Sequence, residues 1–228
     1  MIKFILFFLF SIVVGYAQSF DVEKLSGNVK ILSSGDETWQ QLKPKMKLDG
    51  NTIISTDINS SVTIKNDRIR FTLKESSAIT VSNLKKISLD ELLMALAMEN
   101  VLNTPRKKGS NKSDNTAVYG DKISSNTLTT LQSNDFGVKR INGAKQLVDN
   151  GLKESAIITV QEIYRKYPTT KKDTNTRIYF SDILFELGLY EEAYDDYADI
   201  SKTLDLSNEQ KNYINEKLEQ ISKKLINK

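Results

Sequence analysis

The sequence predicts a mixed α+β protein of more than one domain, in which a small antiparallel all-β domain precedes an α-helical hairpin array. Two observations support this fold class. Between Phe20 and Val81, apolar and polar residues alternate in short runs separated by turn residues, a pattern typical of antiparallel strands. From Ile141 to the end of the chain, apolar residues recur at helical spacing. A chain of 228 residues is long enough for one large domain or two small ones.

Residues 1–17 have the pattern of a secretory signal peptide. Lys3 precedes an apolar run from Phe4 to Val14, and the small residues Gly15 and Ala17 follow at the cleavage-site positions. The apolar run is shorter than the roughly 20 residues that cross a bilayer as a helix. We therefore expect cleavage after Ala17, a periplasmic or secreted chain, and no permanent membrane span after cleavage. A retained anchor is the alternative interpretation.

The composition excludes several kinds of chemistry. The chain has no histidine and no cysteine, which rules out disulfides, Cys/His zinc sites and any triad built on histidine. Lys and Arg number 32 against 29 Asp and Glu, a balance too even to indicate nucleic acid as a partner. We expect a non-enzyme without a metal or cofactor. A hydrolase that works with two carboxylates is the remaining catalytic alternative.

Residues 18–87 are predicted to form the β domain. Short runs with period-two alternation recur about every 8–12 residues, and turn residues such as those at Gly35 and Gly50 separate them. The predicted strands include Val29–Ile31, Ile53–Thr56, Ser61–Lys65, Ile69–Leu73 and Ile79–Val81.

The period changes at Ser88. The run Ser88-Leu89-Asp90-Glu91 has the pattern of a capping box, and the leucines that follow predict an amphipathic helix over residues 88–102 that packs its leucine face on one of the two domains. Residues 103–139 show almost no apolar periodicity and are rich in Asn, Ser, Thr and Lys, so we predict a basic, flexible linker. A short strand at Ala117–Tyr119 is the one element expected within it.

Residues 140–228 are predicted to form a helical domain in which residues typical of turns and close helix crossings recur. Gly151 and Gly188, 37 residues apart, would allow tight turns between paired helices. Ala156 and Ala193 would lie where the paired helices cross closely, and Pro168 would end the second helix of the first pair. A last helix would begin at Ser207 with a capping box.

Five motifs in the first half of the chain follow one another in a recognisable order. They are Leu25-Ser26-Gly27-Asn28-Val29, Trp39-Gln40-Gln41-Leu42, Leu48-Asp49-Gly50-Asn51-Thr52-Ile53-Ile54-Ser55-Thr56, Ser60-Ser61-Val62-Thr63-Ile64 and the run from Ile69 to Val81. This order resembles the FecR-type domain, a periplasmic module of bacterial iron-uptake regulators. The resemblance covers about 60 residues, and Asn51 departs from it because that family has Asp there. The resemblance implies the β fold. Regulators of that family carry a cytoplasmic segment that does not precede the domain in this sequence, so we do not expect the regulatory role.

The last third resembles tetratricopeptide repeats. Gly151, Ala156 and Pro168 match the family's turn glycine, helix alanine and terminal proline, and Gly188 and Ala193 match the first two of these in a second unit. This resemblance implies two helical repeats and a capping helix. It also implies a concave groove that binds peptides.

Four aromatic residues are candidates for ligand binding: Trp39, Tyr164, Tyr179 and Tyr194. Trp39 is the single tryptophan, and it could fill the core of the β domain or form an exposed platform for a sugar or peptide. Seven of the nine tyrosines lie in the helical region, where some must be core and others could line a groove.

Two charged clusters are interpreted as solvated surface. The acids Glu191, Glu192, Asp195, Asp196 and Asp199 share a predicted helix, on which exposed faces commonly produce such clusters. The basic run Arg106-Lys107-Lys108, with Lys112, lies in the predicted linker. Metal binding by the first cluster and nucleic-acid or lipid binding by the second are the alternatives.

Together these observations predict an exported, non-catalytic adaptor that contacts a protein or peptide partner in the bacterial envelope, with envelope signalling as one setting. The alternative is a module that binds a cell-wall glycan through Trp39.

Overall fold

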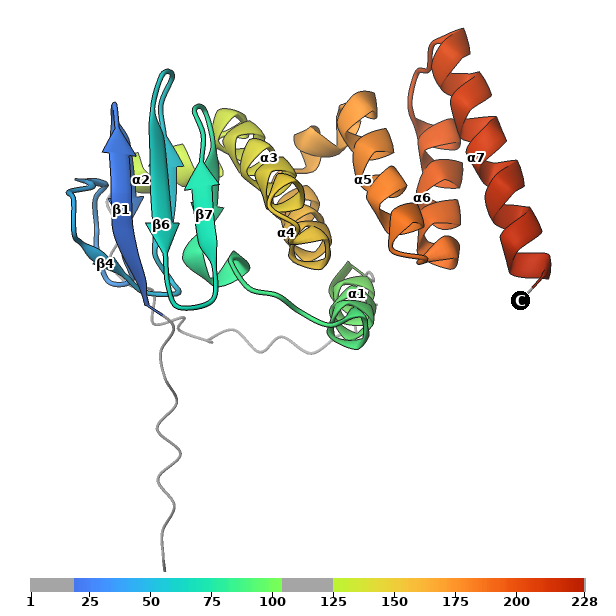
Figure 1. Ribbon diagram of the computed structural model, residues 1–228. Helices are drawn as coiled ribbons and strands as arrows, with labels where there is room; N and C mark the ends of the chain where they lie inside the picture. Colours follow the sequence, from blue (N-terminus) through green and yellow to red (C-terminus); the bar gives the residue numbers. More distant parts are fainter. Residues whose placement is uncertain (1–18, 104–124, 228) are drawn as a thin grey trace, which may run out of the picture.

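The computed structural model describes residues 19–103 and 125–227. Within these residues the chain is a mixed α+β protein with two small antiparallel sheets and seven α-helices (Figure 1). The strands are β1 (Phe20–Ser26), β2 (Val29–Leu32), β3 (Gln40–Gln41), β4 (Lys47–Leu48), β5 (Ile53–Thr56), β6 (Ser61–Lys65), β7 (Arg70–Leu73) and β8 (Ala78–Thr80). The helices are α1 (Leu89–Asn103), α2 (Ser125–Gln132), α3 (Asn134–Asp149), α4 (Lys153–Lys166), α5 (Thr174–Glu186), α6 (Tyr190–Thr203) and α7 (Asn208–Ile226), with short 3₁₀ turns η1 (Val81–Asn83) and η2 (Pro168–Lys172). The predicted signal peptide and the predicted strand at 117–119 lie outside the described residues.

Each sheet has four strands, in the orders β4-β1-β6-β7 and β3-β2-β5-β8. The alternation that predicts the strands corresponds to burial: in β1, Phe20 and Val22 are buried while Asp21 and Glu23 face solvent. The strand β1 itself, which no single motif indicated, pairs with both β4 and β6. Residues of both sheets and of the helices form one continuous hydrophobic core.

The helical region is built from two antiparallel hairpins and a last helix. Gly151 joins α3 to α4 and Gly188 joins α5 to α6, and both glycines have a positive φ, of 74° and 77°, as the turn requires. Ala156 and Ala193 are fully buried, and Pro168 opens η2 immediately after α4 ends. The capping box predicted at Ser207 and Gln210 is present at the start of α7. The sequence thus located the two hairpin turns, the end of α4 and the start of α7 correctly.

The prediction of a flexible linker over residues 103–139 is wrong for its last part. Residues 125–132 form α2, and α3 begins at Asn134 with Ser133 as its N-cap, whose side chain accepts a hydrogen bond from the Phe136 backbone. Apolar periodicity did not reveal α2 or the start of α3 because six of the eight residues of α2 are polar, three of them Thr, and because α3 presents polar side chains to the sheets. The rest of the predicted linker, residues 104–124, lies outside the described residues.

The helix α3 packs directly on the β7–β8 end of the two sheets (Figure 1). Its closest approach is at Gly143, where a β-carbon would lie 2.1 Å from the carbonyl oxygen of Ala78 in β8. No residue other than glycine fits at that distance without backbone movement. The strands and the helical hairpins therefore pack into one structure and do not form two domains with separate hydrophobic cores, as the sequence suggested.

The helix α1 begins with the predicted capping box, in which Ser88 and Glu91 bond each other's backbone amides. It packs on α4, and Arg165 of α4 binds Glu99 of α1 at 3.0 Å. The predicted leucine face is only partly correct, because Leu92 alone is fully buried while Leu89 and Leu93 are exposed. The helix is apolar on all sides, so no single face is marked by the sequence.

The second hairpin contains a buried cation. Arg177 of α5 is 1% exposed, and its guanidinium binds the carboxylates of Asp196 and Asp199 on α6. Asp196 also accepts a hydrogen bond from the Ser181 hydroxyl at 2.6 Å. The interpretation of the α6 acids as a solvated face is therefore wrong for Asp196, which is mostly buried against Arg177. Asp199 also binds Arg177 but keeps about half of its side chain exposed, and the interpretation holds for the exposed Glu191 and Asp195.

We predict that Gly143→Ala lowers the free energy of unfolding by about 2 kcal/mol or more, because the new methyl group overpacks the contact with Ala78. For a domain of this size that corresponds to a melting temperature lower by roughly 4–8 °C. Thermal denaturation followed by circular dichroism measures it. Gly50→Ala is the control, because its β-carbon would meet nothing closer than 3.8 Å. Equal melting temperatures for the two variants would contradict the close approach.

We also predict that Asp196→Ala destabilises the chain by about 2–3 kcal/mol, because it removes one of the two carboxylates that compensate buried Arg177. Asp195→Ala, which removes an exposed acid from the same helix, is expected to change stability by no more than about 0.5 kcal/mol. Chemical denaturation of both variants provides the comparison. Similar costs would mean that Asp196 contributes only as surface charge.

Candidate functional site

A pocket of about 710 Å³ lies at the junction between the β3-β2-β5-β8 sheet and the helices α2 and α3. We call it the Trp39 pocket. Its lining combines two aromatic rings with polar and charged side chains from both parts of the structure. The lining residues are Lys30, Trp39, Gln41, Ser55, Asp57, Thr129, Thr130, Ser133, Asp135, Phe136 and Lys139.

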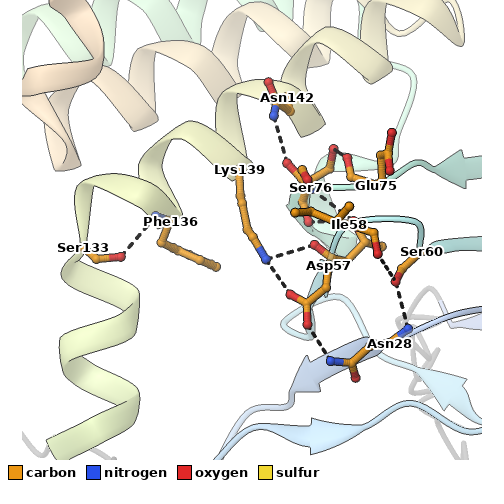
Figure 2. A network of polar contacts seen from close by, with 12 residues as sticks. Asn28, Asp57, Ile58, Ser60, Glu75, Ser76, Ser133, Phe136, Lys139 and Asn142 are labelled. Carbon is orange, nitrogen blue, oxygen red and sulfur yellow. Dashed lines mark hydrogen bonds and ion pairs between the residues drawn. The ribbon is translucent and has the colours of Figure 1, made fainter.

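One face of α3 positions the helical side of this pocket. Lys139, Asn142 and Gln146 follow one another at helical spacing and all bond the sheet (Figure 2 shows the first two). The Asn142 amide donates to the Ser76 carbonyl at 2.8 Å. Gln146 accepts from the Lys74 backbone amide and donates to the Ser77 hydroxyl, both at 2.7 Å. We call these three side chains the α3 seam.

The first residue of the α3 seam also enters the Trp39 pocket. The Lys139 ammonium donates to the Thr56 carbonyl at 3.0 Å and to the Asp57 carboxylate at 2.8 Å (Figure 2). On the other side, the Asn28 amide donates to the second Asp57 oxygen at 2.5 Å. Asp57 is thus held between the β1–β2 turn and α3, which fixes one wall of the pocket.

The hydrogen bond from Lys139 lowers the pKa of Asp57 below its ordinary value, assisted by the charges of Lys139 and Lys30 and by the bond from Asn28, and against the effect of burial. The Asp57 carboxylate is therefore ionised at neutral pH. In this pocket it serves as a hydrogen-bond acceptor and not as a proton donor.

Three aromatic rings contact one another in a row. Trp39 meets Phe136 edge-on with 5.8 Å between ring centroids, and Phe136 meets Tyr167 edge-on at 6.3 Å. Trp39 is half-buried. Its burial therefore lies between the two alternatives that the sequence allowed, a residue that fills the core of the β domain and an exposed platform for a ligand. Its indole nitrogen is buried and has no hydrogen-bond partner among the described residues.

Two smaller pockets adjoin the helices. One of about 310 Å³ lies beyond Phe136, and Arg140, Lys166 and Tyr167 are among its lining residues. The other, of about 230 Å³, lies between α1 and the second hairpin and is lined by Glu99 and the α6 acids Glu192, Asp195, Asp196 and Asp199. Across residues 19–103 and 125–227, no group of three or more acidic side chains is arranged to hold a metal ion.

The three candidate tyrosines do not share a site. Tyr164 is buried with its hydroxyl unpartnered in the described structure, and burial raises its pKa. Tyr179 is half-buried, packs edge-on against Phe180 and has Lys145 over its ring. Tyr194 is exposed on α6. Tyr164 is therefore a core residue, and of the four candidates Trp39 alone lines the pocket of about 710 Å³.

Sequence reasoning missed Asp57, Lys139 and Phe136 as pocket residues. Asp57 and Lys139 are 82 positions apart, and the second of them lay in the predicted linker. The one local signal was Ser133, which stands three residues before Phe136 as an N-cap does. The basic run at 106–108, with Lys112, lies outside the described residues.

Comparison with known proteins adds no relative: no family model, curated protein or solved structure matches the chain. Nor does any helix in the described part of the chain combine the length and apolar character needed to cross a membrane.

We predict that Asp57→Asn lowers the melting temperature at neutral pH, because it removes the charge that Lys139 binds. The pKa of Asp57 is lowered in the folded state, so its contribution is present above the ordinary carboxyl pKa of 3.8 and is lost as the pH falls through the folded-state value. The difference between wild type and variant should therefore shrink below about pH 4. Melting curves across an acid pH series measure it.

Asp67→Asn, in the exposed β6–β7 turn, is the matched control for this series and should follow the wild type at every pH. A difference for Asp57→Asn that stays constant through the acid range would mean that the Asp57 charge does not hold α3 to the sheet.

Proposed function

We propose that the chain is an exported, non-catalytic adaptor of the bacterial envelope that binds an extended segment of a protein partner at the Trp39 pocket. In this proposal a FecR-like β domain and tetratricopeptide-like hairpins supply the two sides of one binding surface. The signal-peptide pattern of the sequence supports export, and the glycine turns at Gly151 and Gly188 support the repeat assignment.

The observation that carries the proposal is the position of the pocket beside a sheet edge. Strand β3 is the terminal strand of its sheet, and both of its residues, Gln40 and Gln41, are exposed. An edge strand offers backbone hydrogen-bonding groups to an added strand. Trp39 and Gln41 line the pocket at this edge, so a segment laid along β3 would place alternate side chains into it.

The lining suits a peptide of mixed character. The rings of Trp39 and Phe136 provide an apolar surface for one side chain of the segment. Lys30, Lys139 and the ionised Asp57 provide charged groups around it, which would set orientation and specificity. In this proposal the ionised Asp57 is one of the charged groups that recognise the segment.

A photo-crosslinking amino acid placed at Gln41 tests the proposal in intact envelopes. We expect a defined crosslinked partner peptide, identified by mass spectrometry, and a loss of most of that product when Trp39→Ala is added. The same crosslinker at Asp67, far from β3 in the sequence and in an exposed turn of the other sheet, is the control. Equal products at both positions, or a product that Trp39→Ala leaves unchanged, would contradict the proposal.

A cell-wall glycan is the second candidate ligand. The half-exposed Trp39 ring beside Gln41, Asp57 and Lys30 supports it, because sugars bind by stacking on an aromatic face with polar groups at the rim. Co-sedimentation with isolated cell wall separates the two candidates. Retention by wall polymer that depends on Trp39, without any crosslinked peptide at Gln41, would favour the glycan.

A further inference from the structure

The pocket of about 310 Å³ beyond Phe136, which we call the Arg140 pocket, contains a buried cation with unused hydrogen-bonding capacity. Its lining residues are Ile53, Leu131, Gln132, Phe136, Arg140, Lys166 and Tyr167. The Arg140 side chain is only 5% exposed. Its Nε and Nη2 atoms are buried and make no hydrogen bond of good geometry within the described residues, although the guanidinium interacts with the Tyr167 hydroxyl. Buried guanidinium donors without partners are rare, because each costs the free energy of desolvation.

The two unpaired nitrogens lie on the same edge of the guanidinium. Nε and Nη2 form the side-on fork whose parallel N–H bonds match the two oxygens of a carboxylate. The remaining nitrogen, Nη1, faces Glu162 at 3.5 Å, so the internal ion pair uses the other side of the group. The geometry of Arg140 thus leaves free the edge that suits a planar, two-oxygen anion.

The charges around the pocket favour a single negative charge. Arg140 and Lys166 both bind Glu162, at 3.5 and 2.6 Å, so two cations share one carboxylate. Burial would raise the pKa of Glu162, but Arg140, Lys166 and Arg165 together hold it below the ordinary value, and Glu162 stays ionised at neutral pH. The cluster therefore carries one uncompensated positive charge.

The walls of the pocket favour an apolar body behind that charge. Ile53 and Leu131 contribute aliphatic surface, and Phe136 and Tyr167 contribute two rings in edge-on contact. The Tyr167 hydroxyl donates to the Leu131 carbonyl at 2.5 Å, which ties α2 to the end of α4 beside the guanidinium. Phosphate, which has no apolar part and carries more charge, fits this lining less well.

We propose that the Arg140 pocket binds a carboxylate attached to an apolar group, with the carboxylate held side-on by Nε and Nη2 of Arg140 and assisted at the rim by Lys166. Because Phe136 lines both this pocket and the Trp39 pocket, a bound peptide segment could occupy the two together. Only this joint occupancy of the two pockets rests on the proposed function. In that case the carboxylate would be the C-terminus of the segment or an acidic side chain within it.

Titration with 3-phenylpropionate tests the site without any partner protein. We expect the Nε–H resonance of Arg140 in a ¹⁵N spectrum of the full chain to shift in a saturable manner. The neutral 3-phenylpropionamide, which has the same apolar body, should cause no such shift. Inorganic phosphate should bind at least about tenfold more weakly than 3-phenylpropionate.

Variants identify the residues that bind. Arg140→Gln should weaken binding of 3-phenylpropionate about tenfold or more, and Lys166→Gln, at a half-exposed position, less than that. Arg140→Lys keeps the charge but removes the fork, so it should also bind weakly; circular dichroism checks the fold of each. If Arg140→Gln does not fold, the wild-type resonance and Arg140→Lys decide the question.

Two results would overturn the site. An Arg140 resonance that does not respond to 3-phenylpropionate would show that water alone satisfies the guanidinium. Equal binding of the acid and the amide would show an apolar pocket without anion recognition.

Short peptides then distinguish the two sources of carboxylate. An acetylated tripeptide ending in Phe with a free carboxylate is compared with its C-terminal amide, and with an amidated peptide that carries an internal Glu. Binding of the first alone assigns the pocket to chain ends, and binding of the third assigns it to acidic side chains. Saturable binding of 3-phenylpropionate with no crosslinked product at Gln41 would retain this site and reject the proposed adaptor role.

Discussion

The contact between α3 and the β7–β8 turn is the interaction on which the rest of the structure depends. It combines a close backbone approach of Gly143 to Ala78 with hydrogen bonds from Asn142 and Gln146 to the turn. Lys139, the third side chain of the α3 seam, bonds Thr56 and Asp57 at the end of β5. The polar groups of the β7–β8 turn would be costly to bury unpaired, and the α3 seam satisfies them from the helix side. These hydrogen bonds fix the position of α3 on the sheets, and the first hairpin is placed with it.

The Trp39 pocket is a product of this contact. Its floor and one wall come from β2, β3 and β5, while Phe136 and Lys139 come from α3 and are separated by less than one helical turn. A shift of α3 along the sheet would move both residues away from Trp39 and Asp57 together. The seam and the pocket are therefore coupled through one rigid element, and a change that loosens the former also alters the latter.

Sequence reasoning succeeded where a local signal exists and failed where the determining contact is remote. Period-two alternation located most strands, and Gly151 and Gly188 located the hairpin turns, because both signals lie within a few residues. Lys139, Asn142 and Gln146 look like the polar face of a loop or a solvated helix until their partners in the strands and turns are brought beside them. These partners are Thr56 and Asp57 for Lys139, the Ser76 carbonyl for Asn142, and the Lys74 amide and Ser77 hydroxyl for Gln146. Likewise, Asp196 is indistinguishable from its exposed neighbour Asp195 until Arg177 is found inside the hairpin.

The serial arrangement of the helices has a mechanical consequence. The last helix α7 packs on α6, the second hairpin meets the first through α4 and η2, and the first is attached to the strands at α3 (Figure 1). A pulling force applied near residue 227 would therefore be transmitted from helix to helix before it strains the sheets, and the weakest junction in that series would yield first. The sheets and the pockets beside them lie at the far end of this series from residue 227.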